Sequence, residues 1–183
     1  MVKNDEWIFW MCGKGGMIEP FEPGQVRDGV VSYGTSSYGY DLRLSREFLV
    51  PEFEPGAHVD PKDTSAVKYT KLTADSILVP ANGFVLARSL EYFRIPRDVL
   101  GIVTGKSTYA RSGVVINVTP LEPEWEGFIT IAVYNTCPVP AALHALEGIA
   151  QVIFIAAEKP CATSYADRKG KYQADKGIST AKI

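Results

Sequence analysis

The sequence predicts an all-β protein with short helices, folded as a distorted jelly roll or β-barrel. Short apolar runs recur along most of the chain, and turn signals such as Pro80-Ala81-Asn82-Gly83 separate them. No long helical period lies between these runs, which argues against a βαβ arrangement. Many short strands at regular spacing are typical of closed or two-layered β folds. The predicted strands lie at residues 30–33, 40–44, 48–50, 77–80, 84–88, 100–103, 114–118, 128–134 and 149–154.

The composition indicates one globular domain over residues 1–183. Apolar residues make up 46% of the chain and charged residues 22%, which is ordinary for a globular protein, and this length can bury a sizeable core. The formal net charge of -2 argues against a broad nucleic-acid surface, so any anion site must be local. No apolar run approaches the length of a membrane span. We therefore expect neither a nucleic-acid partner nor a membrane partner.

Cysteine and histidine usage predicts neither a disulfide framework nor a zinc site. Cys12, Cys137 and Cys161 form an odd, scattered set without a C-x-x-C pair, which indicates a reducing compartment and a cytoplasmic protein. His58 and His144 are the only imidazoles. Zinc-dependent nucleotide deaminases carry H-x-E together with P-C-x-x-C, and this chain has neither sequence. We expect no zinc.

The N-terminal residues predict one short helix. Asn4 or Asp5 could cap a helix over residues 6–11, which glycines at 13, 15 and 16 would end. Trp7, Trp10 and Met11 are spaced three and four apart, and this stripe predicts a packing face. Residues 18–30 contain two prolines and two glycines, so we expect turns there.

Two further segments lack a clear strand pattern. Residues 51–75 are rich in charges and prolines and predict a long loop. Residues 164–183 are polar, cationic and nearly free of aliphatic side chains, a composition that by itself favours a disordered terminus. The alternative is a lid that becomes ordered over a phosphate ligand, with Lys171 as a point charge and Tyr165 or Tyr172 stacking on the ligand.

Residues 105–111 concentrate polar chemistry in one short stretch, Gly-Lys-Ser-Thr-Tyr-Ala-Arg. A tight-turn glycine, a cation, two hydroxyls and an arginine are suited to binding phosphate and to fixing a reacting polar group. The apolar-rich strand at 127–135 would form the wall that faces this stretch. These two segments are the candidate site.

Seven motifs follow one another along the chain, at residues 17–21, 34–41, 91–97, 105–111, 117–127, 147–151 and 170–173. Through these motifs the chain resembles the dCTP deaminase branch of the dUTPase superfamily over nearly its whole length. The resemblance implies the distorted jelly roll of that superfamily, a homotrimer with active sites shared between subunits, and a Mg²⁺-complexed pyrimidine deoxynucleoside triphosphate as ligand. Its implied small-molecule ligands are dCTP, dUTP and, as an inhibitor, dTTP, and Mg²⁺ is bound only through the triphosphate.

Transferred by position, the resemblance implies where the substrate would lie. One group would line the triphosphate and the reacting edge of the base: Lys106, Ser107, Thr108, Tyr109, Ala110 and Arg111. A second group would lie beside the sugar and base: Thr130, Ile131 and Ala132. A third would contact the phosphates or close the site with the C-terminal lid over 164–183: Gln151, Tyr165, Lys171 and Asp175.

Other residues near these motifs keep two interpretations. Asp41 is either a satisfied strand carboxylate or a group near the metal. At least two of Glu122, Glu124 and Glu126 are expected to belong to a solvated hairpin, and Trp125 is expected to be a packing anchor. Arg111 by itself would suggest a structural ion pair. With Ser107 four residues earlier and the family motif around it, a catalytic role is favoured.

The sequence departs from the family at two positions that touch the ligand. Hydrolytic deamination of cytosine needs a group that accepts and returns a proton. In the family, a glutamate held by the arginine equivalent to Arg111 serves this purpose, and a serine equivalent to Ser107 steadies the water or leaving ammonia. The glutamate position is Ala132 here. Asp175 replaces a glutamine in the lid, and an ionised carboxylate only accepts hydrogen bonds.

Three interpretations follow, and dCTP deaminase is favoured by the extent of the resemblance. The first is a deaminase of dCTP to dUTP and ammonia, impaired by Ala132 because loss of a positioned acid–base group costs about 10²–10⁴ in rate. The second is a pyrophosphatase of dUTP or another pyrimidine deoxynucleotide, with Glu122 orienting water. The third is a nucleotide-binding paralogue without catalysis.

Overall fold

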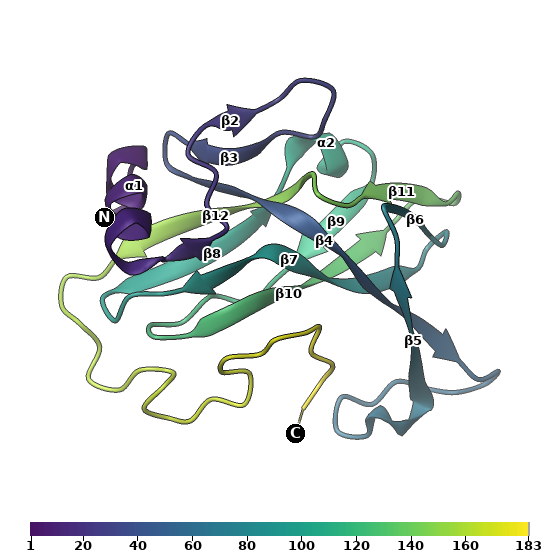
Figure 1. Ribbon diagram of the computed structural model, residues 1–183. Helices are drawn as coiled ribbons and strands as arrows, with labels where there is room; N and C mark the ends of the chain where they lie inside the picture. The colour runs from purple at the N-terminus through teal and green to yellow at the C-terminus, as the bar shows by residue number, and fades with distance from the viewer. Residues whose placement is uncertain (183) are drawn as a thin grey trace.

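A computed structural model describes residues 1–182 and confirms the all-β class (Figure 1). One strand, β4, is much longer than the others and connects the two halves of the sheet. The three helical segments are α1 (Asp5–Gly15), η1 (Thr64–Ala66) and α2 (Ser107–Ala110). The strands are β1 (Ile18–Glu19), β2 (Gln25–Val26), β3 (Tyr33–Ser36), β4 (Gly39–Phe53), β5 (Val67–Thr73), β6 (Ser76–Val79), β7 (Phe84–Arg94), β8 (Val99–Gly105), β9 (Val114–Asn117), β10 (Glu126–Asn135), β11 (Ala141–His144) and β12 (Gly148–Ala156).

Strand β4 belongs to both halves because its two ends pair with different strands. Its first residues pair with β3 and β12, and Asp41 lies opposite Gln151 of β12. Its later residues pair with β5 and β7, and Leu49 lies opposite Leu86 of β7. The pairing with β7 is irregular between Leu44 and Phe48, and such irregularities bend a strand and increase its twist.

The core lies between the two halves of the sheet. Alternate residues of the central strands are fully buried, as the period of two in a strand requires. The largest buried side chains on β4, β7 and β12 include Tyr40, Phe48, Phe93 and Phe154. One buried ion pair lies in this core, where Arg43 Nε is 2.7 Å from an oxygen of the fully buried Glu91.

The N-terminal helix is longer than the predicted residues 6–11, because it continues through Gly13 and Gly15, but a predicted residue caps each end. The side chain of Asn4 accepts a hydrogen bond from the backbone N–H of Trp7, and Gly16 ends α1 in the left-handed conformation. The predicted packing face is only partly correct. Trp7 and Met11 pack against the core, but Trp10 is 54% exposed and instead lies beneath the ammonium of Lys14. None of the helices within residues 1–182 is long and apolar enough to cross a membrane.

Four sequence expectations are corrected. The loop predicted at 51–75 is a loop only in its middle, because β4 runs to Phe53 and β5 covers Val67–Thr73. The strand predicted at 30–33 starts at Tyr33, and the turns at 18–30 contain the short strands β1 and β2. The C-terminal residues, whose composition favoured disorder, run along β10 as an ordered chain (Figure 1). The lid was predicted to end at residue 183, which lies outside the described residues.

Candidate active site

Strand β10 presents two of the predicted site residues away from the core. Thr130 and Ala132 are half-buried, whereas Ile129, Ile131 and Val133 alternate with them and are buried. Ile131 can therefore offer only backbone atoms to a ligand. In the registers of the neighbouring strands, Ala132 lies between Leu86 of β7 and Asn117 of β9.

A cavity of about 850 Å³ lies over this face of β10. Its walls are the outward face of β10, the hairpin that precedes it and the C-terminal residues. It therefore brings together the predicted β10 and lid residues of one chain. The lining includes Leu86, Asn117, Glu122, Trp125, Thr130, Ala132, Tyr165, Arg168, Lys171, Tyr172, Asp175 and Ser179.

We keep the name lid, after the predicted role, for residues 164–182, which line one side of this cavity and make backbone contacts with β10 of the same chain. The N–H of Phe128 donates to the carbonyl of Asp175 at 3.2 Å, and the N–H of Ala174 donates to the carbonyl of Glu126 at 2.9 Å. Further along, the N–H of Ser179 donates to Thr130 Oγ1 at 2.9 Å. These contacts satisfy backbone groups at the edge of the cavity, which explains why a polar segment is ordered.

The hairpin tryptophan supports the lid from below. Trp125 is 8% exposed, and its indole N–H donates to the carbonyl of Tyr172 at 3.0 Å. The backbone N–H of Tyr172 in turn donates to the hydroxyl of Tyr165 at 3.1 Å. Trp125 is thus the packing anchor that the sequence predicted.

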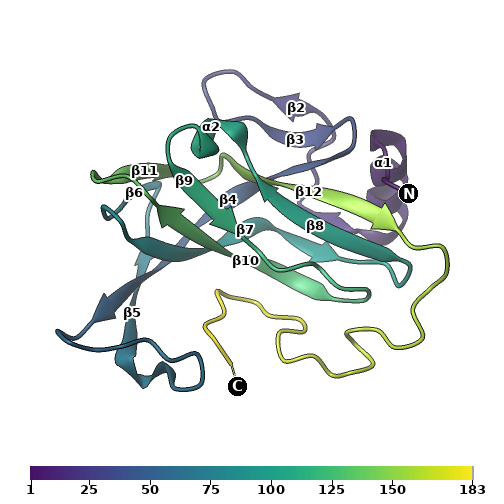
Figure 2. The same cartoon turned by 180° about the vertical axis from the view of Figure 1, so that it is seen from behind.

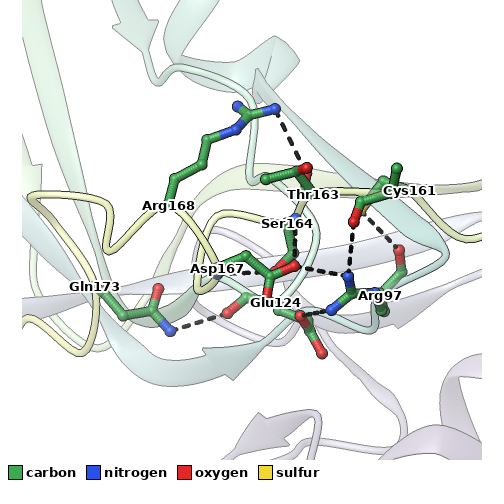
Figure 3. Close-up of polar contacts among 9 residues, drawn as sticks. Arg97, Glu124, Cys161, Thr163, Ser164, Asp167, Arg168 and Gln173 are labelled. Atoms are coloured by element: carbon green, nitrogen blue, oxygen red, sulfur yellow. Dashed lines mark hydrogen bonds and ion pairs between the residues drawn. The ribbon is translucent and has the colours of Figure 1, made fainter.

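A cluster around Arg97 holds the base of the lid (Figure 3). One guanidinium nitrogen is 2.7 Å from a Glu124 oxygen, and another is 2.7 Å from an Asp167 oxygen and also donates to the carbonyl of Ala162. Asp167 also accepts a hydrogen bond from the N–H of Ser164. This backbone hydrogen bond, together with Arg97, lowers the pKa of Asp167. Sequence reasoning gave Arg97 no role, although it lies in one of the motifs that carry the resemblance.

Asp175 is fixed inside the lid. Its carboxylate accepts hydrogen bonds from the hydroxyl of Ser179 and from Lys182 Nζ, the latter at 2.9 Å. Burial opposes ionisation, but these two partners outweigh it and lower the pKa of Asp175. The other carboxylate that lines the cavity, Glu122, is 3.3 Å from Arg168. Both carboxylates are therefore paired with a cation.

The predicted residues on and around α2 lie elsewhere. Ser107, Thr108, Ala110 and Arg111 are exposed, whereas the ring of Tyr109 is buried in the core. Arg111 follows Ser107 by one helical turn, with its N–H donating to the Ser107 carbonyl at 3.0 Å. In the part of the chain that the structure describes, neither the Ser107 hydroxyl nor the Arg111 guanidinium has a hydrogen bond to another side chain.

Two predicted or suspected residues near α2 are held by neighbouring strands. The ammonium of Lys106 is 2.7 Å from an oxygen of Asp41, and both side chains are nearly buried. Asp41 is thus a satisfied strand carboxylate, one of its two interpretations. The amide of Gln151 donates to Ser36 Oγ at 2.9 Å.

The predicted site is therefore divided within one chain. The cavity is lined by the β10 and lid residues, and the α2 residues do not contribute to its walls. Figures 1 and 2, which view the molecule from opposite sides, both place α2 at one end and the C-terminal residues at the other. We find no group of three or more His, Cys, Asp or Glu side chains among residues 1–182 that could hold a metal ion.

Comparisons with known proteins agree with the resemblance. A family model described as dCTP deaminase-like matches residues 4–157. The chain is 54% identical to a dCTP deaminase from Acidobacterium capsulatum, covering 100% of this chain and 99% of that one. It is 55% identical to a dCTP deaminase from Methylococcus capsulatus, covering 99% and 98% of the two chains. The crystal structure of 2'-deoxycytidine 5'-triphosphate deaminase from Agrobacterium tumefaciens has a similar fold, with a TM-score of 0.62 and 14% identity over 85% of this chain and 48% of that chain.

Proposed function

The chain belongs to the dCTP deaminase family, and on this basis we propose that it binds dCTP and hydrolyses it slowly to dUTP and ammonia. The cavity under the lid carries the proposal. Its volume of about 850 Å³ and its lining, with Leu86 and Ala132 on the strand side and Lys171 on the lid side, suit a base next to Ala132 and phosphates next to Lys171. Mg²⁺ would be held by the triphosphate oxygens, because the chain supplies no ligand cluster of its own within residues 1–182.

The proposed reaction adds water to C4 of the cytosine, protonates N3 and expels ammonia. Ser107 would steady the water or the ammonia, and Arg111 would orient the groups at the reacting edge. The methyl group of Ala132 cannot carry a proton. Glu122 and Asp175, the carboxylates of the cavity wall, are each paired with a cation, and neither lies at the position of the family's glutamate. A slow reaction follows from this arrangement.

The division of the site supports a homotrimer in which each site is shared. The exposed face of α2 with Ser107 and Arg111 would complete the cavity of a neighbouring subunit, because in its own chain α2 does not line that cavity. Exposed aromatic and aliphatic side chains across β4, β9 and β10, namely Phe53, Val115 and Tyr134, are available for subunit contacts.

Two alternatives rest on Ala132 and Glu122. Without a carboxylate at 132, the cavity could serve a dUTP pyrophosphatase in which Glu122 orients water toward the α-phosphate, since Glu122 lines the cavity. A nucleotide-binding protein without catalysis would need only the cavity and its cations.

Product analysis separates these three functions. The protein is mixed with Mg²⁺-dCTP and with Mg²⁺-dUTP in separate reactions, and ammonia, dUTP, dUMP and pyrophosphate are measured. Ammonia and dUTP from dCTP support the deaminase, whereas dUMP and pyrophosphate from dUTP support the pyrophosphatase. Tight binding without product supports the binding protein. Absence of binding to either nucleotide contradicts the proposed site.

A further inference from the structure

A nearly buried ion pair joins the residue before α2 to strand β4. Strand β4 does not pair with β8, the strand that leads into α2. Lys106 lies between the end of β8 and the start of α2, and its ammonium is 2.7 Å from Oδ2 of Asp41 on β4. Only 11% of the Lys106 side chain and 7% of the Asp41 side chain are exposed. The same carboxylate oxygen accepts a hydrogen bond from the amide of Gln25 at 2.9 Å. Asp41 therefore accepts hydrogen bonds from two side chains, those of Lys106 and Gln25.

The lysine side chain spans one intervening strand. Strand β12 pairs with β8 on one side and with β4 on the other, and Gln151 lies opposite both Thr104 and Asp41. Two strand spacings amount to about 10 Å. The long side chain of Lys106 covers this distance, together with the one residue by which Lys106 lies beyond the end of β8. The Lys106–Asp41 pair thus fixes the start of α2 across β12.

Helix α2 has few other means of holding its position. It is a single turn of four residues, and its N-cap Lys106 makes no side-chain capping hydrogen bond. Isolated helices of this length are unstable in water. Besides the ion pair, the buried ring of Tyr109 and contacts with β9 hold α2 on the core.

We infer that Asp41 is a positioning residue for α2. It holds Lys106, and Lys106 in turn fixes the helix that presents Ser107 and Arg111. This inference rests on the proposed function for the role of Ser107 and Arg111, and it gives Lys106 a task other than direct contact with phosphate. In this arrangement the ammonium is used within the chain, and the affinity for nucleotide depends on Lys106 through the placement of α2.

Hydrogen exchange tests the placement of α2 without any ligand. The amides of Ala110 and Arg111 donate to the carbonyls of Lys106 and Ser107, so their protection reports the helical turn. Removing one member of a buried ion pair leaves the other charge uncompensated. In Asp41→Asn and in Lys106→Gln, protection at these two amides should fall by about tenfold or more, and by the same factor in both variants. The double variant should lose no more protection than either single variant, because both substitutions break the same ion pair.

Matched variants separate positioning from general destabilisation. Lys106→Arg keeps the ion pair and should retain protection, and Ile131 on β10 should keep its protection in every variant. Lys68→Gln removes the exposed pair with Glu54, whose side chains are 71% and 74% exposed, and should leave α2 unchanged. Unchanged protection at Ala110 and Arg111 in Asp41→Asn, or an equal loss at Ile131, would overturn the inference.

Affinities for dCTP, dCDP and dCMP, measured by calorimetry with Mg²⁺, test the consequence for binding. Positioning predicts that Asp41→Asn and Lys106→Gln weaken dCTP binding by the same factor. Direct phosphate contact predicts that Lys106→Gln weakens it while Asp41→Asn preserves it, and that result would also overturn the inference. If the unaltered protein binds none of the three nucleotides, the proposed function fails, and hydrogen exchange still decides the role of Asp41.

Discussion

The backbone N–H of Ser179 donates a hydrogen bond of 2.9 Å to the side-chain hydroxyl of Thr130. Thr130 lies two residues before Ala132 on the same face of β10, so this contact closes the lid directly beside the position that lacks a carboxylate. The Ser179 amide therefore reports whether the lid is closed over this part of the cavity.

Thr130→Val should loosen the lid, because valine has the shape of threonine but offers no acceptor to Ser179. We expect lid closure to weaken by about 0.5–1.5 kcal/mol, the usual net contribution of one hydrogen bond. Hydrogen exchange at the Ser179 amide measures this change. Thr130→Ser keeps the hydroxyl and should behave like the unaltered protein. Equal protection in the valine variant would show that this hydrogen bond does not hold the lid.

Ala132→Glu should raise ammonia release from dCTP by about 10²–10⁴, because it introduces an acid–base group at the floor of the cavity. Ammonia production over time is the measurement. Ala132→Gln has nearly the same shape but cannot exchange a proton, and it should give no increase. If the glutamate variant is no faster than the glutamine variant, Ala132 does not limit the reaction.

Gly170→Ala should displace the lid, because an added Cβ would overlap the ring of Tyr165. The Tyr165 hydroxyl accepts a hydrogen bond from Tyr172, so moving the ring also disturbs the part of the lid above Trp125. Faster proteolysis of residues 171–182 and weaker dCTP binding are expected. Gly177→Ala is the matched control, because nothing lies within 4 Å of its added Cβ. The idea is refuted if both alanine variants are cleaved at the same rate.

The lid should detach in acid. Hydrogen bonds in the closed lid lower the pKa values of Asp167 and Asp175 below the ordinary value of 3.8. Because each pKa is lower in the closed state, the carboxylates stabilise closure fully above pH 3.8, and this stabilisation disappears as the pH falls through the lowered values. The indole N–H signal of Trp125 in a pH titration follows the change. The double variant Asp167→Asn, Asp175→Asn should lose this pH dependence, and a transition well above pH 3.8 would assign the change to other groups.

Two variants that are each inactive should regain ammonia release when they are combined in one trimer, if each site is shared between subunits. In the Ala132→Glu background, Arg111→Ala removes the α2 contribution and Lys171→Ala removes the lid contribution. In randomly mixed trimers, about a quarter of the sites would combine an intact α2 with an intact lid. Ammonia release by the co-expressed pair is compared with each variant alone. No recovery in verified mixed trimers would place the whole site within one chain.

The sequence by itself determined the fold class and the family. Alternating apolar residues in β10 and the turn signals between strands predicted the sheet. Asn4 or Asp5 and the glycines at 13, 15 and 16 predicted a helix whose ends lie within a few residues of those of α1. These features are local, since they depend on side-chain alternation and on backbone conformation within a few residues. The motifs at residues 105–111 and 117–127 carried the resemblance that the comparisons confirm.

The tertiary structure decided the relations between distant residues. The polar C-terminal residues gave no local sign of order, because their partners are backbone groups and one hydroxyl of β10 about fifty positions away. Asp41 and Lys106 are 65 positions apart, and only the order β4–β12–β8 brings their charges together. Composition and spacing report what one segment prefers, whereas these contacts depend on which segments the folded sheet makes neighbours.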